Sequence, residues 1–220
     1  MIRYSIAIIL GSVLFTSLVV SCGDENPVIQ EMRKAPPSYK SLAEKDDVLF
    51  NLQLLYPLFD WVEYNRVLDD DLIFFFSEDD IANGSPFTEF EKSDEIRILR
   101  HMADPSRHDA VLSIELTLSY SEEEWTPITP EDQKYAGETW YQKTVVYNMI
   151  VQAVPDMTFV CTDVNARVTI REGEDYSGKK MWRIIRWRDG ITDGLLRTPV
   201  EGHAFSKRSS TWGGIKAVYR

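Results

Sequence analysis

The sequence predicts an α+β fold in which the helices come first and long antiparallel strands follow. Apolar residues fall at helical spacing before Pro105, whereas apolar and polar residues alternate after it. No helical run of about 10 to 15 residues separates the later strands, so an antiparallel meander is expected instead of a parallel crossover sheet. The 220 residues are 44% hydrophobic and 12% aromatic, enough for one domain with a substantial core.

The N-terminal residues have the pattern of an export signal. Arg3 precedes an uncharged apolar run from Ile6 to Val20, whose helical length of roughly 22 Å is shorter than the ~30 Å hydrocarbon core. This pattern predicts a signal peptide at residues 1–21, not a membrane span. The stretch 18–22 resembles the lipobox of bacterial lipoproteins, which implies cleavage after Ser21 and a diacylglycerol on Cys22. An ordinary secretory signal with an incidental cysteine is the alternative.

A tether is expected at residues 22–38, where the composition is polar and rich in proline, and a single domain at residues 39–220. Two acyl chains on Cys22 would hold the protein to a membrane of the bacterial cell envelope on its extracytoplasmic side. The net charge of −11 argues against a nucleic-acid partner, because phosphate backbones are bound mainly by clustered lysine and arginine. It also means that the lipid, not charge, must hold the protein to an anionic leaflet.

Three helices are expected in the first part of the domain. A capping-box pattern at Ser41–Glu44 opens the first helix, which Pro57 interrupts. A second cap at Asp60 opens a short helix that ends near Leu68. The third is expected from Thr88 to Met102.

Five strands complete the prediction. An apolar, aromatic strand is expected at 72–76, and alternation predicts a long strand at 112–120. Further strands are expected at 138–153, 157–171 and 180–188, with a turn at Asp175–Gly178 between the last two.

The order of these elements, with several short motifs, resembles the nuclear transport factor 2-like superfamily, also called SnoaL-like. Within it the chain is most similar to an uncharacterised group of bacterial lipoproteins. The resemblance covers most of residues 45 to 220 and is carried by Asn51-Leu52 with Tyr56 and Tyr64, Leu68–Asp71, Phe74–Ser77, Trp182–Ile184 with Trp187 and Asp189, and Trp212–Ala217. It implies a bent antiparallel sheet that wraps helices into a cone.

The resemblance implies no chemistry for this chain. Enzymes of the superfamily, such as ketosteroid isomerases and polyketide cyclases, depend on a pocket acid or an acid–histidine pair, and no such residue can be placed here. Nucleophile-elbow, phosphate-loop and zinc motifs are absent from the sequence.

Histidines near one turn are the weak catalytic candidates. His101 and His108 flank Asp104-Pro105, and a carboxylate from Asp104 or Asp109 would make an acid–base pair with one of them. Two solvated histidines beside a turn are the favoured alternative. His203 lies in a polar stretch and is expected to be exposed.

Acidic clusters at Asp69–Asp71 and Glu78–Asp80 could supply oxygen ligands to Ca²⁺. They lack the spacing of a calcium loop, so acidic turns at the strand ends are expected, and no metal or cofactor. Cys161 is expected to be a buried small hydrophobe. Arg183, Arg186 and Arg188 are expected to be exposed partners of carboxylates.

Aromatic side chains are the remaining candidates for a binding site. Their strand parity differs, so not all of them can face one core layer, and some would line an apolar cavity in the open end of the cone. The expected lining residues are Trp61, Tyr64, Phe74, Tyr147, Trp182 and Trp187.

Three functions remain open from the sequence. The favoured one is a lipid-anchored binding or accessory domain, with a small apolar ligand in the cone or a protein partner on the sheet. The second is a cyclase, isomerase or dehydratase with His101 or an unplaced acid as general base. The third is a structural subunit that forms a homodimer through its sheet.

Overall fold

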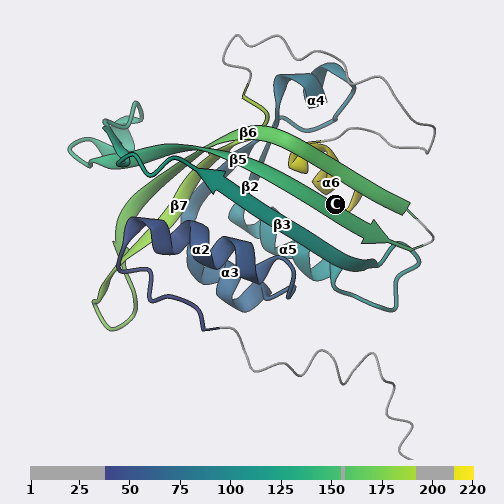
Figure 1. Cartoon of the computed structure of the whole chain (residues 1–220). Helices are drawn as coiled ribbons and strands as arrows, with labels where there is room; N and C mark the ends of the chain where they lie inside the picture. The colour runs from purple at the N-terminus through teal and green to yellow at the C-terminus, as the bar shows by residue number, and fades with distance from the viewer. Residues whose placement is uncertain (1–37, 155–156, 192–210) are drawn as a thin grey trace, which may run out of the picture. The chain divides into compact units, whose positions relative to one another are not determined.

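The structure is a computed structural model that describes residues 38–154, 157–191 and 211–220 (Figure 1). In these ranges a mixed sheet is combined with helices, and the predicted α+β class is confirmed. The helices are α2 (Lys45–Leu55), α3 (Trp61–Val67), α4 (Glu78–Ala82), α5 (Lys92–Met102) and α6 (Trp212–Val218), with a 3-10 turn η1 (Gln133–Tyr135). The strands are β1 (Leu68–Phe75), β2 (Glu89–Glu91), β3 (Val111–Tyr120), β4 (Thr126–Ile128), β5 (Trp140–Ala153), β6 (Met157–Glu174) and β7 (Lys180–Arg188).

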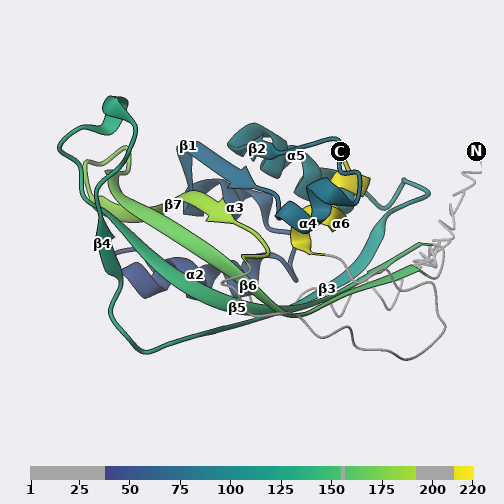
Figure 2. The same ribbon diagram turned by 90° about the horizontal axis from the view of Figure 1, so that it is seen from above.

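The strand order is β2-β1-β7-β6-β5-β3, with β4 also paired to β5. The β3, β5, β6 and β7 strands form the predicted antiparallel meander, with bulges in the β5–β6 and β6–β7 ladders that help the sheet to bend. Figure 2 shows β5 and β6 as one long arc, with α2 and α3 on its inner side.

One strand pair departs from the antiparallel pattern. Strand β1 lies parallel to β7, where Phe74 is opposite Trp187 and Phe75 is opposite Arg188. Helix α3 leads directly into β1. Because no hairpin joins β1 to β7, the chain does not have to run in opposite directions in these two strands. Hydrophobic periodicity identifies a strand but not its neighbour, so the sequence did not indicate this pairing.

Two helices begin later than the sequence predicts. The capping box of α2 uses Glu44 and Asp47, not Ser41, because Leu42 is fully buried in a left-handed conformation (φ 65°). Before α5, the residues Glu89–Glu91 form β2 against β1, and Glu91 then caps the helix together with Asp94.

The prediction of acidic turns at the strand ends was wrong for both clusters. Asp69–Asp71 lie inside β1, where salt bridges from Arg171, Lys92 and Lys134 compensate their charges. Glu78–Asp80 form the first turn of α4, in which the Ser77 side chain accepts a hydrogen bond from the Asp80 backbone N–H. Acidic residues are favourable at a helix N-terminus because of the helix dipole.

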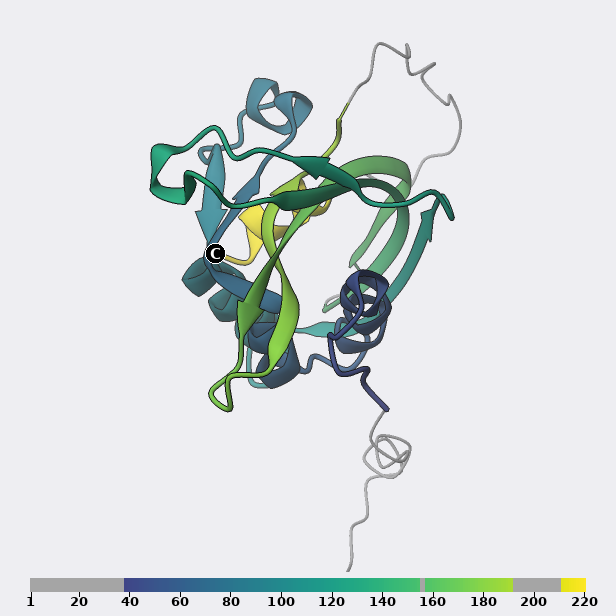
Figure 3. The same cartoon turned by 90° about the vertical axis from the view of Figure 1, so that its left-hand side faces the viewer.

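The core lies on the inner side of the bent sheet. It combines apolar residues of α2 and α5 with inward residues of all the long strands, and Cys161 is buried in it as predicted. A helix at residues 212–218 was not predicted, yet Figure 3 shows α6, in yellow, within the curve of the sheet. No helix of the described residues is long and apolar enough to cross a membrane.

Candidate functional site

A row of buried polar groups crosses the core on the inner side of the bent sheet, a space that we call the cone. The hydroxyl groups of Tyr56, the C-cap of α2, and Tyr64 of α3 lie 2.5 Å apart, and the Tyr64 hydroxyl donates to Glu95 Oε2 on α5 at 2.7 Å. Lys216 of α6 donates to the same carboxylate oxygen from Nζ at 2.6 Å. The side chains of Lys216 and Glu95 are only 2% and 1% exposed, so this is an ion pair in a dry interior.

A second set of hydrogen bonds anchors the start of α6. The Tyr147 hydroxyl donates to Asp189 Oδ1 at 2.7 Å and accepts from the Trp212 backbone N–H at 2.8 Å. The other Asp189 oxygen accepts from the Gly213 N–H at 2.7 Å. A buried tyrosine and a buried carboxylate therefore satisfy two backbone N–H groups that a helix N-terminus leaves without partners.

The N-cap of α6 is joined to α4. Thr211 accepts a hydrogen bond from the Gly214 N–H at 3.2 Å, and its hydroxyl donates to Asp80. Asp80 Oδ2 also accepts from the Ser77 hydroxyl at 2.7 Å. The position of α6 thus depends on side chains from β5, α4 and the residue that follows β7.

Burial controls the ionisation of these groups. Desolvation lowers the pKa of the Lys216 ammonium, and the opposing attraction of Glu95 favours its charged form. Desolvation also raises the pKa of the Asp189 carboxyl, although Tyr147 and the Gly213 N–H oppose this shift. The pKa values of Tyr56 and Tyr64 are raised well above their usual range by burial and by the nearby Glu95.

Little empty space remains among these side chains. The interior cavity has a volume of about 10 Å³, room for no more than a single water molecule. Its lining residues are Leu52, Tyr56, Tyr64, Leu68, Leu72, Phe74, Glu95, Ile184, Trp187, Trp212 and Lys216. The interior of the cone is thus filled, and two of the side chains that fill it belong to α6.

The aromatic residues expected to line a cavity lie in four places. Tyr64, Phe74 and Trp187 line the interior, and Tyr147 is buried beside Asp189 at the start of α6. Trp61 lies outside the interior, 38% exposed, with the Arg100 guanidinium 4.0 Å from its ring centroid.

Trp182 also lies away from the cavity. Its ring packs edge-to-face against Tyr141, and the Lys45 ammonium lies 5.2 Å from its ring centroid.

The histidine candidates do not form an acid–base pair at a cavity. His101 Nε2 lies 3.7 Å from Asp109 Oδ2, which is too long for a hydrogen bond. Asp104 binds Ser106, and His108 is exposed. His203 and Cys22 lie outside the described residues, which contain no cluster of His, Cys, Asp and Glu that could hold a metal ion.

Within the described residues the arginines of β7 bind carbonyl oxygens, sulfur and aromatic rings, and none of them forms a salt bridge with a carboxylate there. Arg183 donates to Glu174 O and to Met181 Sδ, and Arg186 donates to Asp71 O. The Arg188 guanidinium lies 4.4 Å from the centroid of the Phe75 ring.

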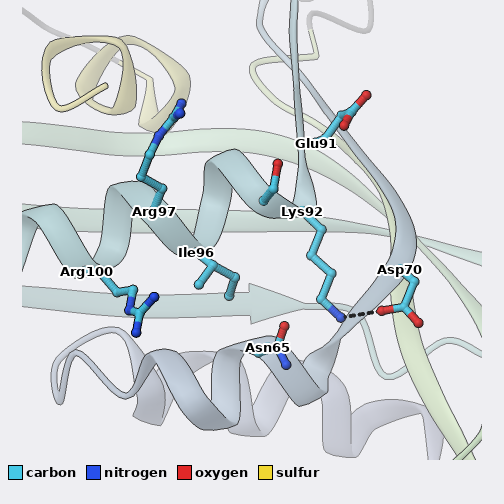
Figure 4. Close-up of a pocket in the computed structure, with 8 residues that line it drawn as sticks. Asn65, Asp70, Glu91, Lys92, Ile96, Arg97 and Arg100 are labelled. Carbon is cyan, nitrogen blue, oxygen red and sulfur yellow. Dashed lines mark hydrogen bonds and ion pairs between the residues drawn. The ribbon is translucent and has the colours of Figure 1, made fainter.

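A surface groove of about 560 Å³ lies between α3, α5 and β1 (Figure 4). Lys92 reaches across it to Asp70, with Nζ and Oδ1 2.8 Å apart, and Arg97 pairs with Asp94. Lys92 and Arg97 are thus already paired with carboxylates. The row of buried polar groups inside the cone is therefore the stronger candidate site.

Glu95 and Lys216 are the site residues that sequence reasoning missed. Glu95 does carry a signal, because it lies three, four and seven positions before Ile98, Leu99 and Met102 and so shares their apolar helix face. A carboxylate on such a face requires a buried partner. The partner, Lys216, lies 121 residues later in the chain, and no pattern in the sequence around Glu95 identifies it.

No family model and no curated protein matches the chain. Among solved structures, a nuclear transport factor 2-like protein of unknown function in nutrient uptake from Rhodospirillum rubrum has a TM-score of 0.42 at 13% identity, covering 68% of this chain and 98% of that one. The beta subunit of a putative aromatic-ring-hydroxylating dioxygenase from Novosphingobium aromaticivorans has a TM-score of 0.40 at 14% identity, covering 72% and 92%. ActVI-ORFA from Streptomyces coelicolor has a TM-score of 0.36 at 10% identity, covering 67% and 93%.

The described residues have an α+β fold in which helices pack in a curved and mostly antiparallel sheet, as the sequence predicts. Likenesses at this level carry no family, ligand or activity over to this chain.

Proposed function

We propose that the protein is a lipid-anchored, extracytoplasmic binding domain that takes a small molecule into its cone in exchange for α6. The observation that carries this proposal is the filling of the cone by Trp212 and Lys216, which are held by polar groups of the scaffold. The groups that receive them are Tyr56, the C-cap of α2, and Glu95 of α5, and both come before α6 in the chain.

Three physical properties make α6 a replaceable occupant. It has only seven residues, too few for a helix to be stable alone, and two of them are glycines, which favour the unfolded chain. Its main polar contact inside the cone is a buried ion pair, in which desolvation offsets most of the Coulomb attraction. The contacts of its Trp212 and Lys216 side chains inside the cone are ones that a ligand of suitable chemistry could reproduce.

A Thr211→Ala variant tests whether α6 leaves the cone. Loss of an N-cap costs about 1 kcal/mol, enough to raise the population of an undocked helix roughly fivefold. We expect stronger binding of a neutral apolar dye such as Nile red, and faster hydrogen exchange at residues 212–218. Asp132→Ala is the matched control, because it removes the N-cap of η1 and should change neither measurement.

The proposal fails if α6 exchanges its amide hydrogens only through global unfolding, at the rate of β5 and β6, in the native protein and in Thr211→Ala alike. The cone would then be a permanent core, and the domain an accessory module without an internal ligand.

Lipid anchoring is a separate part of the proposal. The apolar run that ends at Ser21-Cys22 supports it. Replacement of Cys22 by Ala should yield an uncleaved precursor that takes up no labelled fatty acid, whereas Cys161→Ala should be processed normally. Normal cleavage of the Cys22 variant would contradict a lipobox.

A homodimer is the second candidate, favoured by apolar side chains at one end of the sheet. Leu112 is 62% exposed at the start of β3, and Met157 is 37% exposed at the start of β6. Both adjoin Ala153 of β5 in the register of the sheet. Sedimentation at two protein concentrations tests this, and a coefficient that stays at the monomer value at both would contradict a dimer.

A further inference from the structure

Helix α6 presents an aromatic ring and a primary ammonium group to the interior of the cone. The Lys216 Nζ lies 5.1 Å from the centroid of the Trp212 ring, and both side chains are almost fully buried. Such a separation is also found in small molecules in which two carbons join an aromatic ring to an amine. The helix therefore displays, from two side chains, the groups of an arylethylamine.

The ammonium position has the contacts of a cation site. Lys216 Nζ lies 2.6 Å from Glu95 Oε2 and 3.6 Å from the centroid of the Phe74 ring. A carboxylate and the face of an aromatic ring both attract an organic cation, more strongly when water is excluded. The second oxygen of Glu95 is buried and has no hydrogen-bond partner among the described residues, so it can accept another N–H group.

The ring position is equally well defined. The Tyr56 ring packs edge-to-face against Trp212, with centroids 5.1 Å apart and an interplanar angle of 88°. The Tyr56 hydroxyl accepts the indole N–H at 3.1 Å. The slot thus suits a flat aromatic group, and its one polar contact suits an N–H or O–H donor on that group.

Withdrawal of α6 would leave the Glu95 carboxylate in an apolar environment without its cation. An uncompensated buried charge is strongly unfavourable, so a molecule that replaces α6 should bind more tightly when it brings a positive charge to Glu95. A neutral or anionic aromatic compound would fill the ring slot but leave the carboxylate unpaired.

We propose that the cone binds arylalkylamines, with the amine on Glu95 and Phe74 in place of Lys216, and the ring against Tyr56 in place of Trp212. This assignment rests on the proposed function, because it requires that α6 can leave. It adds the class of ligand, which the exchange of α6 alone does not specify.

Calorimetric titration with tryptamine and with tryptophol, its alcohol counterpart, tests the class of ligand. Both compounds have the same ring and chain length, but only tryptamine is a cation near neutral pH. We expect tryptamine to bind the native protein about tenfold more tightly or better, as a charged hydrogen bond at a buried carboxylate requires. Hydrogen exchange at residues 212–218 should rise as tryptamine saturates the protein.

Two variants connect the effect to the site. Glu95→Gln keeps the size of the side chain but removes its charge, and should abolish the preference for tryptamine over tryptophol. Glu63→Gln is the matched control, since Glu63 is a buried carboxylate of α3 that pairs with Arg66 and does not line the interior. Lys216→Met removes the competing ammonium and should raise the affinity for tryptamine at least tenfold; this variant decides the matter if Glu95→Gln fails to fold.

The outcomes separate the two proposals. Equal binding of tryptophol and tryptamine, with α6 released by both, would overturn the assignment to amines and leave the exchange of α6 intact. A preference for tryptamine that survives in Glu95→Gln, or an unchanged affinity in Lys216→Met, would also overturn it. If neither compound binds and α6 stays protected even in Thr211→Ala, both proposals fail.

Discussion

Gly213 of α6 packs closely against three residues, of which Phe76 follows β1, Asp80 belongs to α4 and Asp189 follows β7. A Cβ atom at this position would lie 2.9 Å from Phe76 Cδ1, 3.2 Å from Asp80 Oδ2 and 3.3 Å from Asp189 Oδ2. The absence of a side chain is what lets its backbone N–H reach Asp189. Glycine is unfavourable inside a helix, but at position 213 of α6 the close packing requires it.

Gly213→Ala should destabilise the protein by about 1–3 kcal/mol, the usual effect of overpacking a core. The loss should appear as a lower urea midpoint with an unchanged slope. Gly173→Ala in β6 is the control, because its nearest neighbour would be 3.9 Å away, and we expect a change within about 0.5 kcal/mol. A fully stable Gly213→Ala protein would show that α6 does not dock as described.

At the scale of elements, an ion-pair cluster ties β1 to β6 across the intervening strand β7. The Arg171 guanidinium donates to both oxygens of Asp69, each at 2.8 Å, and to Asp71 Oδ2 at 3.2 Å. Asp69 is almost fully buried, so its charge requires this partner. The cluster explains how the acidic start of β1 can lie inside the sheet.

Asp69→Asn should destabilise the protein by about 2 kcal/mol, less than the loss of a fully buried pair because the Arg171 side chain remains 20% exposed. Glu172→Gln should cost less than about 0.5 kcal/mol, since its partner Lys180 is mostly exposed. Urea unfolding of both variants checks the comparison, and equal losses would contradict it.

The elements that the sequence predicted well are those whose pattern is local. The alternation at 112–120 and the turn at Asp175–Gly178 depend on neighbouring residues only, and both agree with the structure. Asp69–Asp71 and α6 were missed because their conformations depend on partners about 100 residues away. The same holds for the candidate site, in which Tyr64 and Phe74 were predicted but the Glu95–Lys216 pair was not.

At the scale of the whole molecule, three buried tyrosines make stability depend on alkaline pH. Burial raises the pKa values of Tyr56, Tyr64 and Tyr147 well above their ordinary value of 10.0. Above that pH the unfolded chain loses phenolic protons that the folded chain keeps, so the folded state binds more protons. Its stability is then fully present below pH 10 and lost as the pH rises further.

The free energy of unfolding should fall above pH 10 by up to about 1.4 kcal/mol per pH unit for each of these tyrosines. Lys216 has the opposite effect on stability below pH 10.5, because its lowered pKa lets the folded chain release this proton before the unfolded chain does. It is one group against three tyrosines. Urea titrations on either side of pH 10, with phenolate absorbance, check this. Ionisation of Tyr56, Tyr64 and Tyr147 in a protein that stays folded would contradict it.

The position of α6 along the chain also affects when the domain can fold. Trp212, Ile215 and Tyr219 are buried in the core, yet they follow all the strands of the described residues in the sequence. During synthesis the sheet can assemble before these side chains emerge, but its interior stays open until they do. The last segment to be synthesised is thus the one that closes the core, so a chain released without it would expose the inner face of its sheet to water.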